Sequence, residues 1–372
     1  MRMMAINMSA AFVSVFLYQN GYSIQFLAGY WALFFLLKVI IAMPAAKYAA
    51  MFGPKHGILL SNLLYIPSMI LYAFVPDWGI PALVVTAFLQ AWSAVLYDLC
   101  YLIDFSKVKS VEHAGKEIAY MNIVEKVAKG LSPFVGGLLA FLVSPEATMV
   151  AAAALFAFSS VPLFKTGEPT KTRQKLVFRG FPWRMAWRSL IAESAIGFDA
   201  VASGTVWSML VAIGILGATS NSVYAELGLL LSVVLLAAIA ASHMYGRLID
   251  RRRGGDLLKA AVVANSMVHL TRPFVTSPVV VGSVNVANEI ATTGYAMAFT
   301  RGMFDTADLS GHRITYLGWI EVVANLGAAL GGLVFWLLVT SMGDIDGMRA
   351  MFFIAAPVVL LIMTPKFRLY QK

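Results

Sequence analysis

The chain has 372 residues, of which 60% are hydrophobic and only 13% are charged, and its mean hydropathy is +0.77. A soluble globular protein carries about 25% charged residues, so this composition excludes a soluble globule and indicates a protein that lies in a lipid bilayer. The net charge of +9 does not indicate nucleic-acid binding, because the basic residues occupy alternate loops and form no stretch interleaved with aromatic residues.

Apolar segments long enough to cross a bilayer recur along the chain, since a helix needs about 20 apolar residues to span a hydrocarbon core of roughly 30 Å. They lack the alternation of apolar and polar residues that the strands of a membrane barrel require, so we expect helices. The sequence predicts an all-α integral membrane protein with crossings near residues 3–19, 24–50, 57–76, 79–104, 117–143, 147–164, 187–217, 221–246, 256–275, 278–305, 312–341 and 349–365.

The first of these segments is unusually short. It reaches the polar residue Gln19 after about 17 residues, the minimum for crossing a membrane. A cleaved signal peptide is an alternative, but the segment lacks a clear small-residue cleavage site with a soluble region after it. Alignment of Gly29 with Gly228 places Met1 opposite Ala200, inside the seventh segment. We therefore expect a short first helix, in a chain that is truncated or starts at a late Met.

The loops differ in charge and so predict the orientation. Lys and Arg are frequent in the loop before the seventh segment, 165–187, and in the loop after the eighth, 247–259. The opposite loops carry mainly Asp77, Glu146, Asp344 and Asp346, with Arg272 and Arg349 as exceptions. By the positive-inside rule we expect a multi-pass protein of the cell (inner) membrane with both termini in the cytoplasm.

One stretch of the first half of the chain returns in the second half. The residues GKEIAYMNIVEKVA at 115–128 reappear as GHRITYLGWIEVVA at 311–324, so a unit of about half the chain has been used twice. An even number of crossings per unit brings the second copy in with the same orientation. We therefore expect two six-helix bundles with pseudo-symmetry, 1–164 and 188–372, joined by a cytoplasmic linker at 165–187.

Two motifs carry a resemblance to a known family. The loop after the eighth segment reads GRLIDRRRG at 246–254, similar to a GxLaDRxGR loop with its second glycine one place late. Its counterpart at 46–55, AKYAAMFGPK, has lost the acidic and basic members, and the fifth segment reads SPFVGG at 132–137, similar to the GPxxGG element of many antiporters. With the repeat and the central basic loop, the chain resembles the major facilitator superfamily over essentially its whole length.

In that family the loop motif latches the two halves on the cytoplasmic side, with an acidic partner at the end of the tenth helix. The resemblance implies such a latch at Gly246, Asp250, Arg251, Asp305 and Asp104. Gly246 would permit a tight turn, and Asp250 would accept hydrogen bonds from the first amides of a neighbouring helix. The alternative is that Arg251 and the two arginines after it only set the topology.

Depth along each helix, at about 1.5 Å per residue, separates charged residues at the membrane edge from central ones. Glu125 and Lys129 fall at the cytoplasmic edge of the fifth segment, where they form an i,i+4 pair. Glu321 repeats Glu125 in the second half. We expect these three residues to hold or release the two halves at the cytoplasmic rim, as part of the gate.

Ionisable residues deeper in the membrane cost at least about 2.5 kcal/mol each and therefore indicate function. Lys38 is too far from either end of its segment to snorkel. Around the central Glu289, two asparagines follow the spacing of one helix face, for which hydrogen bonding between helices is the alternative reading. The candidates for solute binding or proton coupling are Lys38, Asp98, Asp199, Asn285, Asn288 and Glu289.

The function that these features indicate is secondary active transport of a small polar or amphipathic solute by alternating access, by a monomer. Protonation of Asp199 or Glu289 would couple transport to protons, and the 132–137 element favours export. We expect no enzyme, cofactor or metal site, since the histidines are scattered and no catalytic motif is present. The alternative is a non-transporting scaffold or sensor, which the short first helix and the lost charges at Ala50 and Met51 favour. The sequence does not indicate the solute or the coupling ion.

Overall fold

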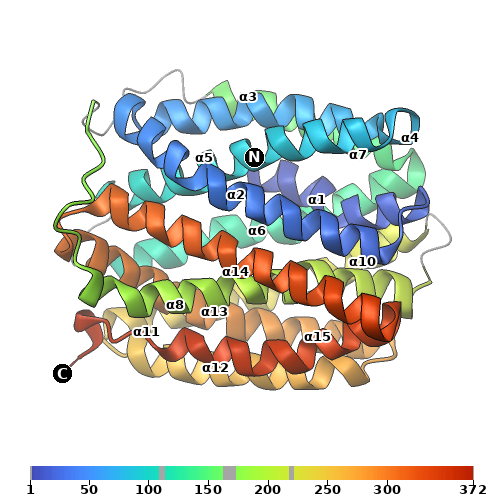
Figure 1. The fold of residues 1–372 in the computed structure, drawn as a ribbon. Helices are drawn as coiled ribbons and strands as arrows, with labels where there is room; N and C mark the ends of the chain where they lie inside the picture. Colours follow the sequence, from blue (N-terminus) through green and yellow to red (C-terminus); the bar gives the residue numbers. More distant parts are fainter. Residues whose placement is uncertain (1, 109–113, 162–172, 218–221, 372) are drawn as a thin grey trace.

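The computed structural model describes residues 2–108, 114–161, 173–217 and 222–371, and most of these residues are helical, with no strand among them. The helices run side by side along one common direction (Figure 1). Helices from the first half of the chain occupy one side of the molecule and most of those from the second half occupy the other. The all-helical architecture is therefore as predicted.

The first half contains α1 (Arg2–Gln19), α2 (Ile24–Phe52), α3 (Pro54–Ala73), the short α4 (Val75–Trp78), α5 (Ile80–Val108), α6 (Ala114–Leu142) and α7 (Pro145–Ser160). Local sequence explains where several of them begin. The Ser23 hydroxyl accepts a hydrogen bond from the Phe26 amide at 3.1 Å and caps α2. Gly53 takes a φ of 92° between α2 and α3, a conformation that favours glycine.

The second half contains α8 (Trp183–Ala200), η2 (Val201–Val206), α9 (Trp207–Met209), η3 (Leu210–Ile215), α10 (Ser222–Ser232), α11 (Leu235–Asp250), α12 (Gly254–Thr271), η4 (Arg272–Phe274), α13 (Pro278–Leu309), α14 (Arg313–Met342), α15 (Asp344–Val359), η5 (Leu360–Met363) and η6 (Arg368–Tyr370). Seven helical runs among the described residues are long and apolar enough to cross a membrane. The larger number of crossings remains a prediction.

The first helix is short, as predicted. α1 has 18 residues, whereas the run Trp183–Ile215 in the second half has 33. In Figure 1 the N-terminal end of α1 lies near the middle of the molecule's length, while the C-terminus lies at one end.

The two halves meet mainly where α2 packs against α14 and where α6 packs against α10 and α11. Glycines allow α6 and α10 to lie close together. A Cβ atom on Gly137 would lie 2.3 Å from the carbonyl oxygen of Tyr224, and one on Gly228 would lie 2.3 Å from that of Pro133. The SPFVGG element of the fifth segment is therefore the place where α6 crosses α10, because only glycine permits backbones to approach this closely.

The linker between the halves is described only from Arg173 onward, since residues 162–172 lie outside the described residues. The amides of Arg173 and Gln174 donate hydrogen bonds of 2.9 Å to the carbonyls of Met51 and Ala50, so this part follows the end of α2. α8 begins at Trp183, within the range predicted for the linker.

The loop motif at 246–254 differs from expectation. Gly246 is buried inside α11 and makes no turn. The turn is formed by Arg252, which takes a φ of 57°. Gly254, the glycine that stands one place late in the motif, packs against Tyr370. A Cβ atom at this position would lie 2.3 Å from the Tyr370 ring, so no larger residue fits without a shift. The tight turn predicted at Gly246 was therefore wrong, since the helix continues for a full turn beyond it.

Candidate functional site

A cavity of about 460 Å³ lies between the two halves. Its walls come from α1, α2, α5 and α6 on one side and from α8, α13 and α14 on the other. The charged side chains that line it are Lys38, Asp98, Glu125, Lys126, Lys129, Glu193 and Glu321. The structure thus brings Lys38 and Asp98, expected at the centre, together with three residues that we expected at the cytoplasmic rim.

A second cavity of about 400 Å³ adjoins the first, since Lys126 and Lys129 line both. Glu289 of α13 and Ser203 of η2 face this second space, as does Trp31 of α2. We call the two spaces the central cavity and the second cavity.

Ion pairs connect the charged residues of these cavities. The Nζ atom of Lys38 lies 3.9 Å from Oδ2 of Asp98, and Lys129 pairs with Glu125 within α6. The Nζ atom of Lys126 lies 2.5 Å from Oε1 of Glu289, an ion pair that joins the two halves. Each of the three lysines therefore has a carboxylate nearby, as ammonium groups in an apolar region require.

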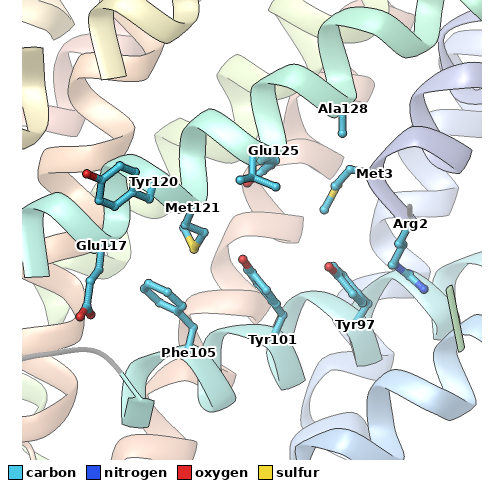
Figure 2. Close-up of a pocket in the computed structure, with 11 residues that line it drawn as sticks. Arg2, Met3, Tyr97, Tyr101, Phe105, Glu117, Tyr120, Met121, Glu125 and Ala128 are labelled. Carbon is cyan, nitrogen blue, oxygen red and sulfur yellow. The ribbon is translucent and has the colours of Figure 1, made fainter. Parts of the chain in front are cut away.

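A groove of about 610 Å³ between α5 and α6 adjoins the central cavity. Figure 2 shows Tyr97, Tyr101 and Phe105 following one another along α5, opposite Met121 and Glu125. All of these except Phe105 also line the central cavity, so the two spaces share a wall. The charged cavity thus continues into an aromatic groove.

Arg2 stands at one end of this groove (Figure 2) and is buried. Its guanidinium donates hydrogen bonds of 3.0 Å to the Ser61 hydroxyl and 3.4 Å to the Ser93 hydroxyl. It lies 3.8 Å from the ring centroid of Tyr97, a cation–π arrangement. No carboxylate among the described residues lies within ion-pair distance of Arg2, so hydrogen bonds and aromatic rings hold this cation.

Asp199 does not line either cavity and is only 1% exposed. Its carboxylate accepts hydrogen bonds from four side chains within the second half. These are Ser203 at 2.8 Å, Asn265 at 2.9 Å, His269 at 2.7 Å and Tyr295 at 2.5 Å. Because Ser203 faces the second cavity, Asp199 is one hydrogen bond away from that space.

The hydrogen bonds assign the protonation of His269. An Nη atom of Arg272 lies 3.2 Å from Nδ1 of His269, and a guanidinium can only donate. Nδ1 therefore accepts this bond, and the Nε2–H group donates to Asp199. The imidazole is neutral, and the Arg272 guanidinium supplies the positive charge beside Asp199.

The polar stripe on α13 divides into two parts. Only Glu289 lines a cavity, where it pairs with Lys126. Asn285 accepts a hydrogen bond of 2.7 Å from Trp207 and donates one of 3.0 Å to the Leu230 carbonyl, which corresponds to the alternative of hydrogen bonding between helices. Asn288 is not among the described residues that line either cavity.

The residues expected to form a cytoplasmic latch lie away from both cavities. Asp250 and Arg251 are exposed at the end of α11. Asp104 and Asp305 lie near the ends of α5 and α13, and their neighbours Phe105 and Phe304 are in contact, with ring centroids 5.8 Å apart. An aromatic contact between the halves thus lies beside the two aspartates.

Several charged residues of these sites were missed from the sequence. Glu193 was not considered, although it shares the helical spacing of one face with Gly197 and Ala200, which line the same cavity. Arg272 was counted only as an exception to the positive-inside rule. A basic residue on the unexpected side of the membrane was the signal that it is buried against a carboxylate.

Two bundles of apolar helices that enclose a charged cavity define a membrane transporter of the secondary type. The family model of the Major Facilitator Superfamily matches residues 1–307, and the chain belongs to this family. It is a multi-pass membrane carrier that moves small solutes, and it is not an enzyme. No curated protein sequence matches the chain.

Solved structures of transporters share the fold. The transporter FucP in its outward conformation superposes with a TM-score of 0.69 and 13% identity over 97% of both chains. The E. coli fucose:proton symporter FucP gives 0.65 and 14% over 97% of this chain and 95% of that one. The human organic anion transporter MFSD10 (TETRAN) gives 0.67 and 14% over 96% of both.

Proposed function

We propose that this transporter moves a small polar or amphipathic solute by alternating access at the central cavity, as a monomer and with coupling to protons. The position of the cavity carries the proposal. Its walls come from both halves, so rocking one half against the other would expose the same charged residues first to one side of the membrane and then to the other.

Two carboxylates support the proton coupling. Glu289 bonds to Lys126 across the two halves, so protonation of Glu289 would remove one charge of a pair that holds them together. Asp199 is linked to the second cavity through the Ser203 hydroxyl, which gives a proton a path of one hydrogen bond. A transporter of similar fold, FucP, is described as a fucose:proton symporter.

Reconstitution tests the proposal. Proteoliposomes that contain a pH-sensitive dye are screened against pooled metabolites and amphipathic drugs, under an imposed pH gradient. Combined Asp199→Asn and Glu289→Gln substitution should abolish pH-driven transport, whereas Glu226→Gln, at an exposed carboxylate on α10, should not. Unchanged pH-driven transport by the combined variant would rule out coupling through these carboxylates.

Lys38 and the residues around it form the proposed solute site. Lys38 and Asp98 pair within the central cavity, and Glu125, Lys129 and Glu321 line the same space, so we assign these three to solute contact as well as to gating. A solute that raises the melting temperature of the wild type but not of Lys38→Ala would support this. The same measurement separates a transporter from a scaffold, which needs no solute.

In the proposed orientation the protein lies in the cell (inner) membrane with both termini in the cytoplasm. The proposed direction of transport is export. The latch residues Asp250, Arg251, Asp104 and Asp305 would then close the cytoplasmic side, next to the contact of Phe105 with Phe304. Uptake into inside-out vesicles, without uptake into right-side-out vesicles under the same gradient, is the expected result.

A further inference from the structure

The two walls of the central cavity differ in charge. The first half contributes both signs, with the residues Lys38, Lys126, Lys129, Asp98 and Glu125. The second half contributes Glu193 and Glu321 here and Glu289 in the second cavity. No basic side chain of the second half is among the described residues that line either space, so all the charged side chains that it contributes are acidic.

The carboxylates outnumber the cations that face them. Each of the three lysines lies within ion-pair distance of a carboxylate, and Arg2 acts on Asp98 from the adjoining groove. These four cations face five carboxylates, Asp98, Glu125, Glu193, Glu289 and Glu321. When all are ionised, at least one carboxylate of the second half has no cation.

The contacts among the described residues leave Glu193 without a cation, and the cation that acts on Glu321 is Lys38, which already pairs with Asp98. Glu321 is 6% exposed, and its Oε1 accepts a hydrogen bond of 2.6 Å from Asn325. No hydrogen bond or ion pair to its Oε2, or to either oxygen of Glu193, is present among the described residues. Both carboxylates line the central cavity, from two helices, α8 and α14, that pack against each other. Two like charges in an apolar surrounding favour the arrival of a cation.

We propose that Glu193 and Glu321 bind the ammonium group of an organic amine. An ammonium group has three donors and satisfies the free oxygens of both carboxylates at once. Tyr97 and Tyr101 line the same cavity and supply aromatic rings for the apolar body of the amine. A volume of about 460 Å³ suits a small organic molecule. This inference rests on the proposed function, since the amine is the solute carried.

Three molecules of similar shape and different charge test the inference: 2-phenylethylamine, 2-phenylethanol and 3-phenylpropionate. Binding to the purified full chain in detergent at neutral pH is measured by calorimetry and by the shift in melting temperature. The amine should bind and raise the melting temperature, and the alcohol and the acid should not. Glu193→Gln should weaken amine binding by at least about tenfold, the loss expected for one charge-assisted hydrogen bond.

Glu193→Gln is the decisive variant, because the Glu193 carboxylate has no hydrogen bond within the described protein and its loss leaves no partner unsatisfied. Glu321→Gln should have an effect of similar size, and Glu226→Gln should have none. Equal binding of all three molecules, no amine binding by the wild type, or unchanged amine binding by Glu193→Gln would overturn the inference. Binding is measured separately from transport, so the two proposals can fail separately. Amine binding without transport would contradict only the proposed function. Proton-driven transport without amine binding would contradict only this inference.

Discussion

Lys126 of α6 and Glu289 of α13 form an ion pair of 2.5 Å that joins the two halves of the transporter. The two side chains are 19% and 16% exposed, so water screens their attraction only in part. In the proposed alternating access, parts of the two halves separate, so a bond at this position would be made and broken during a transport cycle. The pair is therefore the contact through which a proton on Glu289 would act on the motion.

Removal of one member of this pair should destabilise the protein. Lys126→Met leaves the Glu289 carboxylate without its cation, and we expect a cost of roughly 1–3 kcal/mol. The double variant with Glu289→Met should lose less than the sum of the single variants, because neither charge is then left alone. The melting temperatures of the wild type, the two single variants and the double variant are measured in detergent. Lys116→Met, at an exposed lysine of the same helix, is the control, and additive losses would show that the pair contributes nothing.

Asp199→Asn should destabilise the second half strongly. The substitution removes the charge that accepts hydrogen bonds from four side chains and leaves the buried Arg272 guanidinium without a counter-charge. Breaking a buried pair in this way costs roughly 3–5 kcal/mol. Adding Arg272→Met to Asp199→Asn should restore part of the melting temperature. A single variant as stable as the wild type would mean that Asp199 is uncharged in the native protein.

Gly137→Ala should weaken the contact of α6 with α10. The added Cβ would lie 2.3 Å from the Tyr224 carbonyl oxygen, so the two helices have to move apart, at a cost of roughly 1–3 kcal/mol. Gly282→Ala on α13 is the matched control, because its nearest neighbour would be a methyl carbon of Val233 at 4.0 Å. Melting temperatures of both variants give the result, and equal values would contradict the close approach.

A covalent link between α2 and α14 should stop transport. Nε2 of Gln25 donates a hydrogen bond of 3.0 Å to the Thr340 hydroxyl, which places these side chains side by side across the two halves. The chain has a single, buried cysteine, so Cys100→Ala provides a background for Gln25→Cys and Thr340→Cys. A short bismaleimide should abolish transport by the double variant and spare each single variant. Full activity of the cross-linked protein would exclude separation of the halves at this point.

The depth of a charged residue was accessible from the sequence, but the face of the helix that carries it was not. Asp199, which we expected to lie deep in the membrane, is buried in the protein, and its side chain bonds to α12 and α13 within one bundle. Asn285, on the same helix as Glu289, bonds to neighbouring helices, whereas Glu289 faces the second cavity. Glu125 and Glu321 were expected at the rim, because depth was estimated along single helices. In the structure both line the central cavity.

The sequence by itself determined the membrane class and the helical structure, and its internal repeat predicts a duplication. An apolar run of about 20 residues leaves its backbone no hydrogen-bond partner in lipid except its own helix, so composition was sufficient for this conclusion. Only the tertiary structure decided which charges meet. The pairing of Lys126 with Glu289 and the position of Glu193 and Glu321 on one cavity bring together residues far apart in the chain. The rotation of each helix about its axis, which decides such contacts, is set by packing against its neighbours.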